Sequence, residues 1–179
     1  MRLLTLTCAA LVLVSCKTST TERLGLPPLT TVPKVELNRY LGTWYEIGSF
    51  PQSFQKGCTG TTATYSLRED GLIRVENRCR KDALDGPENV AVGRARVVDP
   101  SGAKLEVSFF GPFWGDYWVI DLAEDYSFAV VGNPSRDYLW VLSRRPTMPA
   151  EVLEGIRARL AEKSYTLERF VMTTQPATP

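Results

Sequence analysis

From Val35 onward the chain is divided into short runs of β-branched and aromatic residues, which recur about every ten residues with turn residues between them. The eight runs are 43–49, 61–68, 72–80, 90–98, 104–110, 116–122, 128–132 and 138–143. This spacing favours an all-β barrel or sandwich over crossover units, because parallel strands need longer connections between them. Eight strands can close a small barrel that holds one small ligand and leaves no exposed sheet edge.

Two patterns in the spacing of apolar residues complete the predicted outline of the domain. In 73–77 and 104–109 apolar and polar residues alternate, which gives each strand one apolar and one wetted face. In 150–163 apolar residues recur at three and four positions, so we expect one amphipathic helix packed outside the barrel. A short final strand is expected over 166–172, with loose residues from Thr173 on. We place the domain at 34–175 and the tail at 176–179.

The first 15 residues are typical of a secretion signal rather than of the folded domain. Arg2 supplies one positive charge, and the apolar run 3–14 is too short to span a membrane stably. Leu13-Val14-Ser15-Cys16 is similar to a bacterial lipobox, in which the Cys sulfur receives a diacylglycerol and cleavage leaves Cys16 as the acylated first residue. A plain signal peptide, cleaved elsewhere to release the protein, is the alternative.

The residues that follow Cys16 predict an anchored, peripheral protein. The segment 17–33 is rich in Thr and Pro and is expected to be a flexible tether. Lys17 stands where inner-membrane lipoproteins of enterobacteria have Asp, so by resemblance we expect sorting to the outer membrane. Several acyl chains together hold a protein on a bilayer almost permanently, here on the periplasmic face.

Charge and composition exclude several classes of function. Removing Arg2 from the 21 Lys and Arg residues leaves 20 cations against 20 Asp and Glu residues, so the mature chain is neutral. It has no basic run that would favour nucleic acid. Histidine is absent, which excludes Ser-His and Cys-His catalysis, His-zinc sites and His-ligated haem. We expect no cofactor and no metal.

Cys58 and Cys79 are the two thiols left in the folded part, and in an oxidising periplasm such a pair is usually bridged. They lie in runs joined by the turn 69–71. A three-residue loop with Gly71 in the left-handed conformation puts them on opposite faces unless a bulge intervenes, whereas a four-residue loop puts them on the same face. Two unpaired buried thiols are the alternative.

Three segments resemble those that define the lipocalin family. They are 38–47 with Gly42 and Trp44, 117–131, and 138–146 with Arg144. In lipocalins the Arg after the last barrel strand covers the Trp of the first strand, so the resemblance implies a cation–π contact that closes one end of the barrel. It spans about 35–175 and implies an all-β, eight-stranded, up-and-down antiparallel barrel with one helix outside.

Within the family, the segments 39–47, 63–67, 107–113 and 137–140 are similar to the bacterial outer-membrane lipoprotein lipocalins, relatives of apolipoprotein D. The resemblance implies a lipid-anchored protein that binds fatty acids or lysophospholipids and serves membrane maintenance under stress. Relatives can dimerise, although no residue here requires a homodimer. Apolipoprotein D bridges a Cys near position 58 to its C-terminal region. No late Cys exists here, so any bridge must join Cys58 to Cys79.

The period of two predicts which side chains line the cavity. If Arg144 reaches inward over Trp44, Trp140 shares its face about 13 Å along the strand. The residues expected to line the cavity are Tyr65, Ile73, Val75, Asn77, Leu105, Val107, Phe109 and Trp140. Phe113 and Trp114, between two glycines, are expected at the open mouth, where they would touch an acyl chain or a membrane. Trp118 is a further candidate that changes the pocket volume if it faces inward. The alternative for each aromatic residue is ordinary barrel core.

These observations predict binding without chemistry: an acyl chain enters the apolar barrel and its head group stays near the mouth. Two other functions are open. The barrel could be a scaffold without ligand that binds another envelope protein. It could also be a thiol-dependent enzyme, but Cys58 or Cys79 would then need a neighbour that lowers the thiol pKa, and no His is present to do so.

Overall fold

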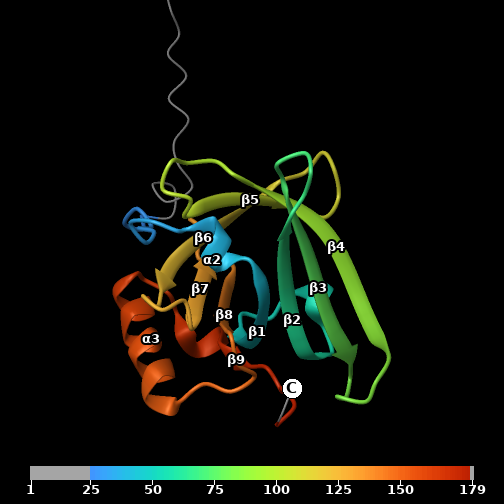
Figure 1. Ribbon diagram of the computed structural model, residues 1–179. Coiled ribbons are helices and arrows are strands. Elements are labelled where there is room, and N and C mark those ends of the chain that lie inside the picture. Colours follow the sequence, from blue (N-terminus) through green and yellow to red (C-terminus); the bar gives the residue numbers. More distant parts are fainter. Residues whose placement is uncertain (1–24, 178–179) are drawn as a thin grey trace, which may run out of the picture.

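A computed structural model describes residues 25–177, so the signal peptide, Cys16 and the first part of the tether lie outside the described residues. Eight antiparallel strands form a closed barrel (Figure 1). They are β1 (Gly42–Ser49), β2 (Cys58–Leu67), β3 (Ile73–Lys81), β4 (Glu88–Val97), β5 (Lys104–Ser108), β6 (Gly115–Leu122), β7 (Phe128–Gly132) and β8 (Leu139–Ser143). Each strand pairs with the next, and β1 pairs with both β8 and β2, which closes the ring. The predicted fold is confirmed.

The barrel wall separates two apolar clusters because successive side chains of a strand point to opposite faces. On β3, Ile73 and Val75 are 2 % exposed and belong to the interior cluster, while Arg78 forms an ion pair with Glu88 on the outer face. On β8, Leu142 belongs to the interior cluster. The neighbouring Leu139 and Val141 of that strand belong to the outer cluster.

Helix α3 (Ala150–Glu162) covers the outer cluster, as predicted, and Figure 1 shows it opposite the wall formed by β2, β3 and β4. It begins directly after Pro149, and Lys163 is its C-terminal cap. Leu153, Ile156 and Leu160 are buried against the barrel. Each such side chain contributes about 1.5–3 kcal/mol when fully buried, so the helix is held by this stripe.

The segment before the barrel is packed on it, which corrects the prediction of a tether over the whole of 16–33. The Leu29 side chain is buried in the outer cluster. The backbone N–H of Val32 donates to the Val119 carbonyl at 3.0 Å, and Arg136 donates to the Pro27 carbonyl at 2.7 Å. Prolines stop regular structure here, but they do not prevent an extended chain from packing on the outside of the barrel. The short helix α2 (Leu37–Tyr40) follows and leads into β1.

Two predicted strands are shorter than the sequence indicates. β5 ends at Ser108 rather than at residue 110, because Gly111 and Pro112 follow and proline has no N–H for the sheet. The final strand is a two-residue piece, β9 (Val171–Met172), preceded by a 3₁₀ turn, η2 (Leu167–Arg169). β9 pairs with the end of β1. A second 3₁₀ turn, η1 (Ser53–Gln55), follows β1.

Residues 173–175 are bonded to the barrel, so the prediction that the chain is loose from Thr173 is wrong for them. β1 pairs with β2 from Gly42 to Tyr45. Beyond Tyr45, toward the mouth of the barrel, the two strands are not paired with each other. The Thr173 N–H donates to the Ile47 carbonyl at 3.0 Å. The Gln175 side-chain amide donates to the carbonyls of Glu46 and Thr61, each at 2.8 Å. Residues 173–175 therefore fill the gap between β1 and β2.

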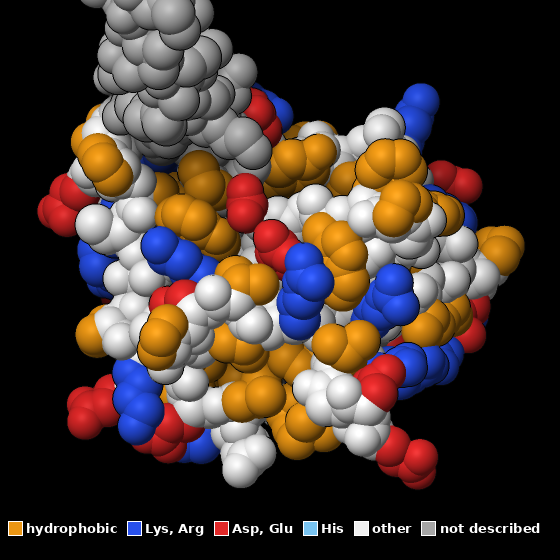
Figure 2. Space-filling view, turned by 90° about the horizontal axis from the view of Figure 1, so that it is seen from above, with side chains coloured by type: hydrophobic (Ala, Val, Ile, Leu, Met, Phe, Trp, Pro, Cys, Tyr) orange, Lys and Arg blue, Asp and Glu red, His pale blue; other side chains and the backbone are white. Residues whose placement is uncertain are grey.

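Charges of both signs are mixed on the outer surface. On the face in Figure 2, basic, acidic and apolar side chains are interspersed rather than gathered by kind. On the outer side of β4 and β5, Arg96 pairs with Glu106 at 2.7 Å. Within residues 25–177, no helix combines the length and the apolar character that crossing a bilayer requires.

Candidate functional site

The closed end of the barrel is built on Trp44, whose side chain is fully buried. The Arg144 guanidinium lies 3.7 Å from the centre of the Trp44 ring and donates to the carbonyls of Arg39, Leu41 and Thr43 at 2.7–2.9 Å. Gly42 has a φ of 91°, and a Cβ there would lie 3.4 Å from Arg144, so glycine suits both the backbone and the approach of the guanidinium. The structure thus contains the contact that the three residues predict.

Three tyrosine hydroxyls meet above this end. The Tyr117 hydroxyl is 2.8 Å from that of Tyr40 and 2.8 Å from that of Tyr65. Burial raises the pKa of Tyr65 to about 12 and raises the pKa values of Tyr40 and Tyr117 well above the usual value. The phenols are therefore neutral hydrogen-bonding groups at physiological pH. Sequence reasoning missed Tyr40 and Tyr117 as interior residues, although Tyr117 stands two positions before the buried Val119.

The interior just above the closed end is filled almost completely. A cavity of about 10 Å³ is lined by Leu37, Tyr40, Tyr65, Ile73, Val75, Ala95, Leu105, Val107 and Tyr117. Five of the predicted lining residues are among them. This volume is close to what a single water molecule needs, and it is far smaller than an acyl chain.

Farther from the closed end, the inward side chains are less buried. Val107, Phe109 and Trp140 pack against the interior cluster but are only partly buried. The Trp140 indole N–H donates to Gln55 at 2.9 Å and its ring stacks on Tyr138. Asn77 is half-buried on the face of β3 that carries Val75. The side chains are therefore packed tightly in the lower half of the barrel, near the closed end, and are less buried in its upper half, toward the mouth.

The other three predicted aromatic residues do not line the interior. Trp118 belongs to the outer cluster, with the Lys104 ammonium 4.2 Å from its ring, because it alternates with the inward Tyr117 and Val119. It does not line the cavity. Trp114 lies over Arg96, 4.3 Å from its ring, on the outer side of β4. Phe113 is 76 % exposed on the β5–β6 loop, the loop on which it is expected, and its contact with a ligand or a membrane stays a prediction.

The disulfide between Cys58 and Cys79 is present, with a Cα–Cα distance of 5.4 Å. The Arg68 N–H donates to Leu72, which leaves a three-residue loop with Gly71 at a φ of 79°. A bulge between Thr59 and Thr62 shifts the register. This is the bulge that a three-residue loop requires for the two Cys residues to share a face.

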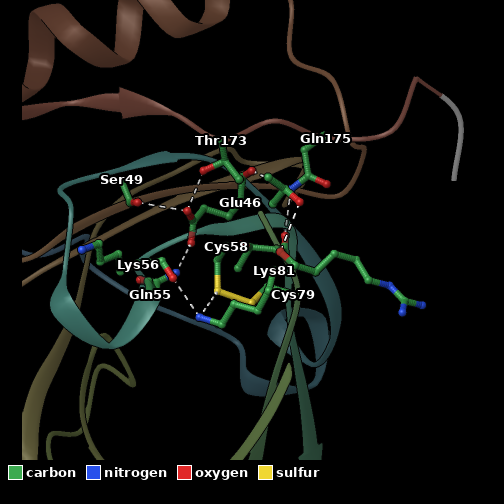
Figure 3. The surroundings of a disulfide bond; sticks show 12 residues. Glu46, Ser49, Gln55, Lys56, Cys58, Cys79, Lys81, Thr173 and Gln175 are labelled. Atoms are coloured by element: carbon green, nitrogen blue, oxygen red, sulfur yellow. Dashed lines mark hydrogen bonds between the residues drawn. A yellow bond between two sulfur atoms is a disulfide. The ribbon is translucent and has the colours of Figure 1, made fainter. Parts of the chain in front are cut away.

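A polar cluster surrounds the disulfide at the open mouth (Figure 3). The Glu46 carboxylate is 5 % exposed and accepts hydrogen bonds from Ser49, Gln55 and Thr173 at 2.6–3.0 Å. Sequence reasoning missed Glu46, although it stands two positions after the inward Trp44. Its donors Gln55 and Thr173 come from distant segments that no pattern in the sequence connects to it.

Lys81, the last residue of β3, completes this cluster. Its ammonium donates to the Lys56 carbonyl at 2.8 Å and lies 3.6 Å from the Cys58 sulfur. The site thus combines an apolar cup with a polar rim. Within residues 25–177, no three or more His, Cys, Asp and Glu side chains are grouped as a metal site.

A closed antiparallel barrel with a Trp–Arg pair at one end and an open mouth at the other defines a small-ligand binding fold. Residues 35–175 match the family described as a lipocalin-like domain. The chain belongs to the lipocalin family, whose members are generally binding and transport proteins.

Similar proteins indicate which members of the lipocalin family this chain resembles. The chain is 41 % identical to the outer membrane lipoprotein Blc of Escherichia coli, over 98 % of this chain and 99 % of that protein. It is 36 % identical to mouse apolipoprotein D, over 80 % of this chain and 79 % of that protein. The structure of insecticyanin from the tobacco hornworm Manduca sexta has a TM-score of 0.67 at 17 % identity, over 85 % of this chain and 87 % of that one, and shares the fold.

The similarity to outer membrane lipoproteins extends over nearly the whole chain and includes the segment around Cys16. It places this protein among the lipid-anchored lipocalins of the outer membrane.

Proposed function

We propose that the protein binds a single-chain lipid, a fatty acid or a lysophospholipid, and stores it or carries it between the outer membrane and the periplasm. The acyl chain occupies the upper half of the barrel, and its head group stays at the mouth. No covalent step is involved. The acyl anchor on Cys16 keeps the barrel on the periplasmic face, where lipid turnover under stress supplies such ligands.

The observation that carries this proposal is the partial burial of inward apolar side chains in the upper half. Val107, Phe109 and Trp140 pack against the interior cluster and are only partly buried. An acyl chain laid against them leaves water, which is favourable by about 25 cal/mol per Å² of apolar surface. A preformed wall keeps the ordering cost small.

A second candidate function is supported by the small size of the cavity. Typical ligand pockets measure about 300–1,000 Å³, whereas the cavity here measures about 10 Å³. A barrel without ligand that binds another envelope protein would account for this volume. Phe54, Phe110 and Phe113, which are 61–82 % exposed in loops, would then be contact residues.

Native mass spectrometry of the delipidated protein distinguishes the two functions. Uptake of one fatty acid or one lysophospholipid per chain, with a change in Trp140 fluorescence, is the result expected for lipid binding. The matched control is Trp118→Phe, which alters an outer Trp and leaves the response unchanged. A delipidated wild-type protein that takes up neither lipid would overturn the lipid-binding proposal in favour of the scaffold.

A further inference from the structure

Lys81 is a cation at the barrel mouth that no carboxylate neutralises. None of the ion pairs within residues 25–177 includes it. The residue is half-buried, and its ammonium donates to one backbone carbonyl, that of Lys56. An ammonium has three N–H donors, so a further donor is available beside the weak contact to the Cys58 sulfur.

Within residues 25–177, the acidic groups near Lys81 form no ion pair with its ammonium. Glu88 pairs with Arg78 and Arg80 on the outer face of the barrel. The Asp82 carboxylate lies over Gly57. Glu46 is held by three neutral donors, as Figure 3 shows. A partly desolvated cation without a protein counter-ion is costly unless a ligand supplies the negative charge.

The position of Lys81 fits a ligand whose chain enters the barrel. Period two places it on the same face of β3 as Cys79, Asn77 and Val75, which point inward. At about 3.3 Å per residue, the strand from Lys81 to Val75 is about 20 Å long. The disulfide joins Cys79 to Cys58 and so holds the end of β3 beside the loop that carries the Lys56 carbonyl. The ammonium is thus fixed at the rim above the apolar wall.

We propose that Lys81 is the residue that binds the anionic head group of the lipid, a carboxylate or a phosphate, at the mouth. This inference rests on the proposed lipid binding and names the group that selects among lipids with the same acyl chain. The protein is expected to prefer anionic single-chain lipids over uncharged ones. A charge-assisted hydrogen bond in a partly dry site is stronger than one between neutral groups.

The test compares three ligands that share a palmitoyl chain: palmitate, a lysophosphatidylglycerol and monopalmitoylglycerol. They are titrated into the delipidated full mature chain carrying Cys16→Ser, which removes the anchor. In Lys81→Met, the Kd for the two anionic lipids is expected to rise about tenfold, while that for monopalmitoylglycerol changes less than about twofold. Lys81→Arg should retain most of the preference. Lys56→Met is the matched control, because its exposed side chain is removed while its carbonyl stays.

The outcomes separate this assignment from the function on which it rests. An equal loss for all three ligands in Lys81→Met, or no loss for any, would overturn the role of Lys81 while leaving lipid binding intact. Wild-type protein that binds none of the three would overturn lipid binding and this assignment together. Competition by an equal concentration of inorganic phosphate would show a site for free phosphate instead, since a lipid site gains its affinity mainly from the chain.

Discussion

Arg144 joins the start of β1 to the end of β8 through a single side chain. Its guanidinium covers the Trp44 ring, and the carbonyls it binds lie between the end of α2 and the start of β1. A guanidinium can do this because its donors form a planar fork that also stacks on an aromatic face. Lysine has neither property, so the position depends on the shape of the group as much as on its charge.

Replacing Arg144 with Ala is expected to lower the free energy of unfolding by about 2–4 kcal/mol, because three carbonyls lose a charged donor and the buried indole loses its cover. The free energy of unfolding of Arg144→Lys should lie between that of the wild type and that of Arg144→Ala. Urea unfolding followed by Trp fluorescence measures both. The neighbouring exposed Arg145→Ala is the control and should change stability by less than about 0.5 kcal/mol. Equal stability of Arg144→Ala and Arg145→Ala would contradict this role.

The interior tyrosines predict a loss of stability at alkaline pH. The pKa of Tyr65 is about 12 in the folded protein and near 10 when unfolded, so the unfolded state releases its proton first as the pH rises. The stabilisation is complete below pH 10 and is lost as the pH rises from about 10 to 12, at up to about 2 kcal/mol for Tyr65 alone. Urea midpoints across this range measure it, and Tyr65→Phe should show a smaller fall. A wild-type midpoint independent of pH would refute the prediction.

At the scale of elements, the C-terminal residues 173–175 supply hydrogen bonds where β1 and β2 are not paired with each other. β1 and β2 separate beyond Tyr45, and residues 173–175 bond to both of them. Buried backbone groups need partners, and this segment supplies them where the sheet does not. The mouth of the barrel is therefore closed along this side by the end of the chain.

Deleting residues 173–179 is expected to leave a folded barrel with a loosened mouth. Amide hydrogen exchange should accelerate in 46–49 and 58–61 and stay slow in β6 and β7, because local opening follows the loss of local hydrogen bonds. Deleting only 176–179 is the control and should change neither region. Equal exchange rates of 46–49 and 58–61 in the two truncated proteins would show that residues 173–175 do not stabilise the mouth.

At the scale of the whole molecule, the segment between Cys16 and the barrel limits how far the barrel can lie from the membrane. Cys16 precedes the first described residue, Gly25, by nine positions, and an extended chain of that length spans at most about 32 Å. From Pro27 on, the chain is packed on the barrel. An acylated Cys16 therefore keeps the domain close to the bilayer surface.

Two substitutions test this anchoring in cells. Cys16→Ser removes the acylated sulfur, so the protein is expected in the soluble fraction or as an uncleaved precursor rather than as a mature lipoprotein. Lys17→Asp keeps the anchor but is expected to shift the protein to the inner membrane. Fractionation with immunoblotting measures both, and Thr18→Ala is the control. Outer-membrane recovery of Cys16→Ser at wild-type levels would contradict lipid anchoring.

Much of the barrel could be predicted because its causes are local. Alternation defines the strands, the change of period marks α3, and the Gly42–Trp44–Arg144 pattern indicates the closed end. The errors have a common origin, because they concern contacts between segments that are distant in the chain. Trp114 contacts Arg96 on a neighbouring strand, and residues 27–33 and 173–175 find partners on the barrel surface.

The sequence by itself indicated an all-β domain of about eight strands, the apolar face of most strands and the outer helix, since these follow from period and turn chemistry. The closed barrel and the Trp44–Arg144 contact were expected from the resemblance to lipocalins, and the bridge between Cys58 and Cys79 was one of two alternatives. Only the tertiary structure decided how much of the interior is filled, that three tyrosine hydroxyls converge above Trp44, and that Lys81 lies at the mouth without a counter-ion. Side-chain packing and long-range hydrogen bonds depend on the distances between strands, and those distances exist only once the sheet has closed.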